Sequence, residues 1–261
     1  MRKPSKIPTS YRMIKIIEVV GKSGNALTQA EINRQINLPK QSLHRLCERL
    51  LQEGYLVKEE NNRLAPGERL KALARSIFLD SDQKIVRHQI LHSAAQKIGE
   101  TINLVIPETK GMIYIDRVET DWPLRIQLPI GSNVPFHCTA SGKTYLSKLP
   151  AKEQRILASN LELSQLTNNT ICTTDDLIKE LNVVSKQGFA LDLEEFIPGM
   201  VAAAVPISDM NGKYIASLAF HGPTQRLSLE ELLEKKEFLF DSAKQLQEVL
   251  ASPLSVLREK S

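Results

Sequence analysis

The sequence predicts an α+β protein in two unlike parts, a small, mostly helical N-terminal domain and a larger C-terminal domain built on an antiparallel sheet. Helical spacing of apolar residues dominates up to about residue 98, and several runs beyond it have the length and period of short strands. Pro66-Gly67 interrupts the pattern early in the chain. The 261 residues also exceed the usual size of one domain, roughly 100 to 200 residues.

Positive charge is concentrated in the N-terminal part. Residues 1–64 hold 12 Lys and Arg against 6 Asp and Glu, whereas the remaining 197 residues hold 22 against 24. A basic domain on a near-neutral body suggests that this domain alone binds a polyanion. A solvated basic surface without a partner is the alternative that charge by itself leaves open.

The first quarter of the chain predicts two helices in succession. Apolar residues at helical spacing predict the first over residues 10–22. Thr28 and Glu31 have the spacing of a capping box, in which the Thr hydroxyl accepts from the Glu amide and the Glu carboxylate reaches back. The second helix is therefore expected over residues 28–36.

A tight turn then leads into a third helix. Asn37 tolerates a left-handed backbone and Pro39 suits a turn or a first helical position, so this helix begins near Lys40. Its apolar stripe consists of Leu43, Leu46, Cys47, Leu50 and Leu51. After Gly54, two strand-like runs flank a polar turn, residues 55–58 and 63–64.

This order of elements is that of a winged helix-turn-helix, whose third helix enters the major groove of DNA. Gln pairs with adenine and Arg with guanine, while other cations contact phosphates. The predicted DNA-binding residues are Arg12, Arg34, Lys40, Gln41, Ser42, His44 and Arg45, with Lys58 or Arg63 touching the backbone from the wing. A three-helix core with a basic face and no DNA partner remains the alternative.

Beyond Pro66-Gly67 the sequence predicts two further helices and then a mixed domain. The helices are expected over residues 68–79, as a linker, and 84–98. Strands are expected at 101–107, 112–118, 124–130, 189–191, 200–208 and 214–220. Helices are expected at 141–149, 152–161, 175–186 and 228–250. This mixture indicates an antiparallel sheet flanked by helices.

Other classes of protein find little support in the sequence. No apolar run is long enough to span a bilayer, so we expect a soluble, cytoplasmic protein without membrane contact. Three scattered cysteines without a CxxC pair argue against disulfides or zinc, and no metal or cofactor is expected. His137, Cys138, Asp192 and His221 lack the spacing of a metal site or a Cys–His nucleophile, and the triplet at 142–144 lacks the upstream glycines of a phosphate loop.

Several separated motifs resemble one known family. They are residues 37–46 with Gly54-Tyr55, residues 135–143, residues 166–171 and residues 188–195, followed by Pro198-Gly199, residues 204–206 and Gly222-Pro223. In this order, over residues 10–250, they resemble the isocitrate lyase regulator (IclR) family of transcription factors.

The resemblance implies a GAF-like effector-binding domain, dimers or dimers of dimers, and control of catabolic operons by small carboxylates or aromatic acids. It also implies effector-binding roles for Ala140, Ser141, Asp192, Met200, Ala202, Ala219 and His221. The backbone amides around residues 140–142, at a helix start, suit a carboxylate. The alternatives are that Asp192 only caps a turn and that His221 is only a residue at the end of a strand.

Two departures from the family pattern limit what can be transferred. Asn37 replaces the usual Gly of the turn and Gln41-Ser42 replaces Ser-Thr, so the operator sequence does not carry over. The glyoxylate-type pocket uses small polar side chains where this chain has Ala202, Ala219 and His221. We therefore expect glyoxylate to bind poorly, and an organic acid with an apolar or aromatic body and a hydroxyl to bind better.

The sequence as a whole predicts a DNA-binding domain over residues 1–66, a linker helix over 67–82 and an effector domain over 83–261. The expected function is that of a ligand-responsive regulator of a catabolic operon, without enzyme activity, which binds operator DNA as a homodimer or tetramer and senses a small organic, possibly aromatic, carboxylic acid. The alternative is a metabolite-binding enzyme or scavenger with a vestigial DNA-binding domain.

Overall fold

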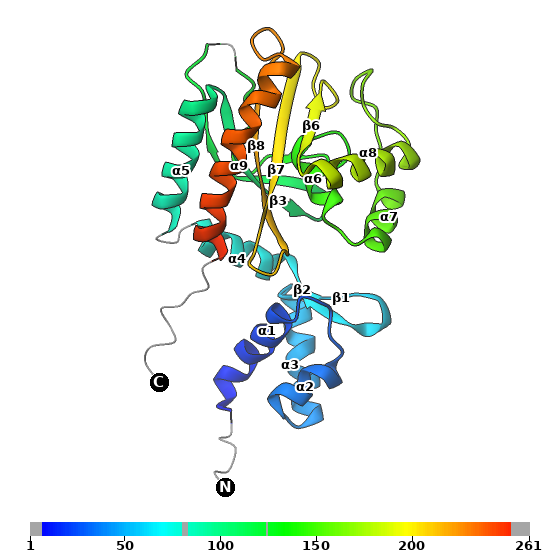
Figure 1. The fold of residues 1–261 in the computed structure, drawn as a ribbon. Coiled ribbons are helices and arrows are strands. Elements are labelled where there is room, and N and C mark those ends of the chain that lie inside the picture. Colours follow the sequence, from blue (N-terminus) through cyan, green and yellow to red (C-terminus); the bar gives the residue numbers. More distant parts are fainter. Residues whose placement is uncertain (1–6, 80–82, 124, 252–261) are drawn as a thin grey trace. The chain divides into compact units, whose positions relative to one another are not determined.

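The computed structural model describes residues 7–79, 83–123 and 125–251 of the chain (Figure 1). The chain divides into two compact units, residues 1–81 and residues 82–261. Each unit has its own core and is described by itself.

The N-terminal unit is a winged helix-turn-helix, as the sequence predicts. Its elements are the 3-10 helix η1 (Thr9–Tyr11), α1 (Arg12–Lys22), α2 (Gln29–Ile36), α3 (Lys40–Gln52), β1 (Leu56–Lys58), η2 (Glu60–Asn62), β2 (Leu64–Pro66) and α4 (Glu68–Leu79). Strands β1 and β2 form the antiparallel hairpin, the wing. The predicted stripe of α3 is buried at Leu43, Cys47 and Leu50, against Ile16 and Val20 of α1 and Ile32 of α2.

Side-chain hydrogen bonds fix the ends of α2. The predicted capping box is present, since Thr28 accepts from the Glu31 amide and the Glu31 carboxylate accepts from the Thr28 amide. At the other end, Asn37 adopts a left-handed backbone with φ of 49°. The Asn33 side chain then bonds both the amide and the carbonyl of Leu38, at 2.9 Å each. These bonds set the turn that aims α3.

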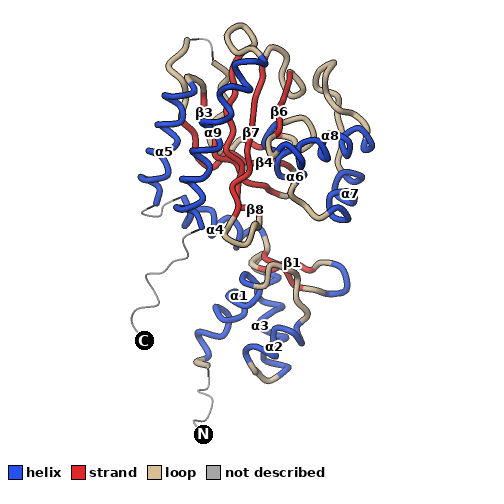
Figure 2. Tube along the Cα trace, in the orientation of Figure 1, coloured by secondary structure: helices blue, strands red, loops and turns tan. Residues whose placement is uncertain are grey.

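The C-terminal unit is a six-stranded antiparallel sheet in the order β5-β4-β3-β8-β7-β6 (Figure 2). Its strands are β3 (Thr101–Glu108), β4 (Gly111–Val118), β5 (Asn133–Val134), β6 (Ala190–Leu193), β7 (Met200–Ser208) and β8 (Tyr214–Pro223). Its helices are α5 (Gln83–Ile98), α6 (Ala140–Ser147), α7 (Ala151–Asn160), α8 (Thr174–Gln187) and α9 (Leu229–Ala251). Helices α5 and α9 cover one face of the sheet, and α6, with α8 and α7 beyond it, covers the other (Figure 1).

One predicted strand is wrong. Residues 125–130 are irregular, and Leu124 lies outside the described residues. The run contains Pro129, which has no amide to donate to a sheet ladder. Pairing with β4 begins only at β5, after Gly131 and Ser132 have bonded the Tyr114 backbone. The residues of this run are half-buried or exposed, and Ile130 is 56% exposed, so the apolar run predicts neither a strand nor burial here.

Replacing Asn33 by Ala should loosen the turn between α2 and α3. The change removes two half-buried hydrogen bonds to Leu38, each worth about 1 kcal/mol net. Hydrogen exchange, followed by mass spectrometry over residues 28–45, should show faster exchange in N33A than in wild type. Gln35→Ala, an exposed change on the same helix, serves as the control and should leave exchange unchanged. Equal protection in N33A and wild type would contradict this role for Asn33.

Candidate DNA interface and effector site

The N-terminal half of α3 presents the side chains predicted to meet DNA bases. Lys40, Gln41, His44 and Arg45 are exposed, and Ser42 is half-buried. None of these side chains forms a hydrogen bond or ion pair with another residue of the described part of the chain. This face of α3 is therefore open to a partner.

The flanking cations differ in how tightly the domain itself holds them. Arg34 is exposed, whereas Arg12 is half-buried and donates from Nε to the Ile7 carbonyl at 3.1 Å. On the wing, Lys58 lies 3.5 Å from Glu48, and Arg63 donates to the Ala26 carbonyl and to the capping-box carboxylate of Glu31. Arg63 thus has a structural role in joining the wing to α2.

The predicted effector residues of the sheet lie on its α6-covered face. Directly paired residues of antiparallel strands point to the same face. Asp192, Ala202 and His221 form one row across β6, β7 and β8, and Ala219 precedes His221 by two residues on the same face. Met200 stands in the same relation to Ala202 on β7. All five side chains are buried.

Helix α6 packs directly on this face. Ala140, at its first turn, packs against Ala202, Ala204 and Ala219. The Ser217 hydroxyl donates to the Ser141 carbonyl at 3.3 Å, and the Thr144 hydroxyl donates to the Ala204 carbonyl at 3.2 Å. The seven effector residues predicted from the family resemblance are thus brought together between α6 and the sheet.

The amides at the start of α6 are partly used by the helix's own cap. The Thr139 hydroxyl accepts from the Gly142 amide at 3.1 Å, and the Thr139 carbonyl accepts from the Lys143 amide. The expectation that Gly142 contributes an amide to a carboxylate is therefore wrong. The amides of Ala140 and Ser141 donate to no residue within the described ranges.

Asp192 uses one carboxylate oxygen to cap a turn and leaves the other without a partner among the described residues. Its Oδ1 accepts from the amides of Glu195 and Phe196, at 2.7 and 3.3 Å, and so caps the turn after β6. Its Oδ2 is buried and has no hydrogen-bond partner in the described part of the chain. Burial, followed by the nearby Glu195 carboxylate, raises the pKa of Asp192 to about 7. One oxygen therefore holds the fold and the other is available to a donor.

A buried ion cluster, which the sequence did not reveal, adjoins Asp192. The Lys143 side chain, only 1% exposed, donates to Glu195 and to Glu180 of α8. Burial raises the pKa of Glu195. Its Oε2, like Asp192 Oδ2, has no hydrogen-bond partner among the residues that the structure describes. In the sequence Lys143 belongs to the rejected phosphate-loop triplet and to the resemblance motif at residues 135–143, and neither assigned it a role. The signal that could have found it is a lysine on an otherwise small and apolar helix face.

A second buried network surrounds His221. Its Nδ1 lies 3.1 Å from the side-chain nitrogen of Asn103, and its Nε2 lies 3.4 Å from the Ile126 carbonyl. Asn103 uses its oxygen to accept from Arg117, so its nitrogen donates to His221 Nδ1, and the ring proton lies on Nε2. Burial, with the Arg117 charge, lowers the pKa of His221 to about 4. His221 is neutral, and both of its nitrogens are engaged.

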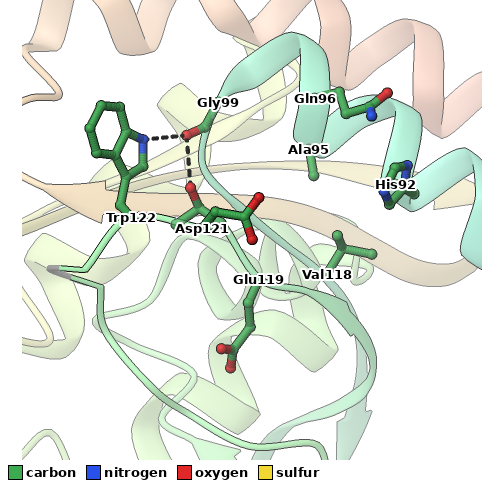
Figure 3. A pocket seen from close by; sticks show the side chains of 9 residues that line it. His92, Ala95, Gln96, Gly99, Val118, Glu119, Asp121 and Trp122 are labelled. Carbon is green, nitrogen blue, oxygen red and sulfur yellow. Dashed lines mark hydrogen bonds between the residues drawn. The ribbon is translucent and has the colours of Figure 1, made fainter.

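A separate hollow lies on the other face of the sheet (Figure 3). It measures about 470 Å³ and is lined by α5, through His92, Ala95 and Gln96, and by the end of β4 and the loop that follows it. Trp122 donates to the Gly99 carbonyl at its rim. Val118 lines this hollow, whereas its neighbour Arg117 points to the α6 side. None of the predicted effector residues lines it.

Comparison with known proteins identifies the family. Residues 80–248 match the family model described as bacterial transcriptional regulator IclR C-terminal. The chain belongs to the IclR family of transcriptional regulators. Residues 14–63 of this IclR-family protein also match a MarR-family model, in agreement with the helix-turn-helix of the N-terminal unit.

Known transcription regulators match over most of the chain. The probable transcriptional regulator SauR of Cupriavidus necator is 34% identical over 86% of this chain and 89% of its own length. The acetate operon repressor of Salmonella typhimurium is 26% identical, covering 92% of this chain and 89% of its own. The crystal structure of the Thermotoga maritima IclR matches with a TM-score of 0.63 at 26% identity, over 93% of this chain and 98% of that one.

These comparisons confirm the α+β fold class and the regulator function. The matched relatives are transcription regulators, so this IclR-family protein is a DNA-binding regulator and not an enzyme. Among the described helices, none combines the length and the apolar character that crossing a membrane would require.

Asp192 should make the stability of this IclR-family protein depend on pH. Its pKa in the folded chain, about 7, exceeds the unfolded value of 3.8, so the folded state binds more protons. The stability that Asp192 contributes is therefore complete at low pH and is lost as pH rises from about 4 to about 7. In Asp192→Asn this loss should vanish. The free energy of unfolding should then fall less with rising pH than in wild type, by on the order of a few kcal/mol.

Melting temperatures of the ligand-free protein, measured by circular dichroism from about pH 5 to pH 8, test this. Glu195 remains in the variant, and its raised pKa keeps a smaller slope of the same sign. Asp241→Asn, at an exposed carboxylate on α9, is the control and should follow wild type. Parallel curves for Asp192→Asn and wild type would contradict the prediction.

Proposed function

We propose that this IclR-family regulator binds double-stranded operator DNA through α3 and responds to a small organic acid bound between α6 and the sheet. The observation that carries the proposal is the gathering of all seven predicted effector residues around one buried face, where a carboxylate oxygen of Asp192 lacks a partner. An unpaired buried acceptor is costly unless a ligand donor satisfies it. The name of the Salmonella typhimurium relative, an acetate operon repressor, favours a catabolic operon as the target.

The side chains favour a particular kind of acid. Ala202, Ala219 and Met200 make an apolar wall, and Asp192 Oδ2 can accept from a hydroxyl. The amides of Ala140 and Ser141, at the positive end of α6, or a cation on the same face can hold a carboxylate. The effector is therefore an organic acid with an apolar or aromatic body and a hydroxyl, and glyoxylate binds poorly.

Regulation follows from a population shift. A ligand that prefers one arrangement of the C-terminal unit changes how often the DNA-binding units of an oligomer fit their paired half-sites. We propose a cytoplasmic homodimer or tetramer, because one winged domain contacts too few base pairs for useful specificity. The alternative of a scavenger with a vestigial DNA-binding domain is less favoured, because the unpaired polar side chains of α3 remain exposed.

Arg45 and Gln41 should read bases. Replacing either by Ala should weaken binding to a preferred DNA by about 1 to 3 kcal/mol and binding to random DNA far less. The preferred DNA is selected by the wild-type protein from a randomised pool, and affinities are measured by fluorescence anisotropy at fixed salt. Arg49→Ala, which removes an exposed arginine paired with Glu53 on the same helix, is the control. Equal losses on both DNAs would assign Arg45 and Gln41 to phosphate contacts.

Asp192 should select for a hydroxyl on the effector. Calorimetry with 4-hydroxybenzoate, 4-hydroxyphenylacetate, mandelate, lactate and glyoxylate should rank glyoxylate last. Asp192→Asn should weaken the best hydroxy acid by about 1 to 3 kcal/mol, because a buried hydrogen bond to a charged group is lost. His221→Ala should cost a similar amount by disrupting the Asn103 network.

DNA affinity without ligand provides the control for both variants and should stay within a few-fold of wild type. Normal acid binding by both variants, or a cation as the best ligand found, would show that the effector does not bind at this face. Binding of no acid in the set would reject the proposed effector class.

A further inference from the structure

Arg117 places a buried positive charge on the same face as the predicted effector residues. It lies on β4 and pairs with Asn103 of β3, which in turn pairs with Ala219 of β8. Paired residues share a face, so Arg117 faces the side covered by α6. Its side chain is only 3% exposed. The family resemblance assigned it no role.

The hydrogen bonds of Arg117 leave part of its guanidinium unused. A guanidinium has five N–H donors. Nε donates to Glu119 at 3.2 Å, Nη1 to the Asn103 side-chain oxygen at 3.0 Å and Nη2 to the Ile126 carbonyl at 2.7 Å. Each terminal nitrogen therefore keeps one N–H without an acceptor in the described part of the chain. Two such donors on one planar group suit a carboxylate.

The charge around Arg117 is also incompletely balanced. Among the described residues its one carboxylate partner is Glu119, which is 39% exposed and also accepts from Arg125 at 3.0 Å. His221 is neutral and Asn103 carries no charge. Two arginines thus share one carboxylate, and the more buried of them is the one that faces the α6 side. A buried charge is costly without a full counter-charge, so this end of the face favours an added anion.

Arg117 and His221 are parts of one network. They share two partners, the Asn103 side chain and the Ile126 carbonyl. Because both nitrogens of His221 are engaged, Arg117 rather than His221 has donors to offer a ligand. His221 was predicted to contact the effector directly, and the network instead suits it to hold Asn103, and through it Arg117, in place.

The opposite end of the face offers an acceptor. The Arg117 guanidinium bonds Asn103 of β3, which lies three strands from Asp192 of β6 with β8 and β7 between them, or about 14 Å between the backbones. The side chains between the two ends include Ala202, Ala204 and Ala219. A two-carbon acid is too short to reach both ends, whereas an acid group and a hydroxyl at opposite ends of a ring have a suitable separation.

We propose that Arg117 binds the acid group of the effector and that the effector is a bipolar molecule, an acid at the Arg117 end and a hydrogen-bond donor at the Asp192 end. This inference rests on the proposed effector function and identifies the residue that binds its charge. It makes Arg117, rather than the two amides at the start of α6, the main source of selectivity for an anion.

Pairs of acids and their uncharged amides test the inference. Calorimetry on the full chain compares 4-hydroxybenzoate with 4-hydroxybenzamide, and benzoate with benzamide. Wild type should prefer each acid, and Arg117→Met should reduce the acid-to-amide affinity ratio by about tenfold or more. Arg117→Lys, which keeps the charge but not the planar fork, should retain part of the preference. Arg125→Met, at the other arginine on Glu119, is the matched control and should keep the ratio.

A purely structural role for Arg117 would weaken acid and amide alike and leave their ratio unchanged, which would overturn the inference. A second measurement does not depend on the variants folding well. In ¹⁵N-labelled wild type, the Arg117 Nε–Hε signal, assigned by its loss in Arg117→Lys, should shift saturably with benzoate and not with benzamide. Acid binding that moves only the amide signals of Ala140 and Ser141 would overturn the inference and leave the proposed function standing. If neither benzoate nor 4-hydroxybenzoate gives a saturable response, the inference is overturned. The Arg45 and Gln41 variants would still test the DNA-binding part of the proposed function.

Discussion

The close approach of α6 to its surroundings governs the arrangement of the C-terminal unit. A Cβ on Gly142 would lie 2.3 Å from the Phe136 carbonyl oxygen, so only glycine allows the helix to start there. On the sheet side, Ala202, Ala204 and Ala219 are small enough for Ala140 to rest on them. Larger side chains at these positions would lift α6 off the sheet or force strain. The same small residues that permit the contact also form the apolar centre of the proposed effector-binding face.

Charged groups lie at both ends of the apolar part of this face, and a different hydrogen-bond network holds each of them. On one side Lys143 of α6 pairs with Glu195 and Glu180, next to Asp192. On the other side Arg117 is held through Asn103 and the Ile126 carbonyl. Buried ionic groups add little net stability, because desolvation offsets their attraction. At the proposed effector face they would instead confer specificity, since a ligand without matching groups would leave them unsatisfied.

Local signals in the sequence predicted the N-terminal unit well, because its capping box, left-handed Asn37 and apolar stripe act over a few residues. The alternating strands were found for the same reason, whereas Pro129 defeated the pattern at residues 125–130. The polar network at the site was not predictable in this way. Asn103 and His221 are 118 residues apart, and an inward-facing Asn or Arg on a strand identifies its partner only when the register of the sheet is known. The resemblance supplied Asp192 and the alanines but not Arg117.

Asp192 would link ligand binding at the proposed site to the rest of the unit, because one of its oxygens holds a turn and the other is left for a donor. Oδ1 holds the amides of the turn after β6, and the hydroxyls of Thr167 and Thr170 hold the carbonyls of Glu194 and Glu195 in the same turn. That turn carries the carboxylate that pairs with Lys143 of α6. A donor at Oδ2 stabilises the charged form of Asp192, which changes the charge balance at Glu195 and Lys143. A ligand bound at the proposed site would therefore act on the contact between α6 and the sheet without displacing either, and in this way a small molecule can bias a population of conformations.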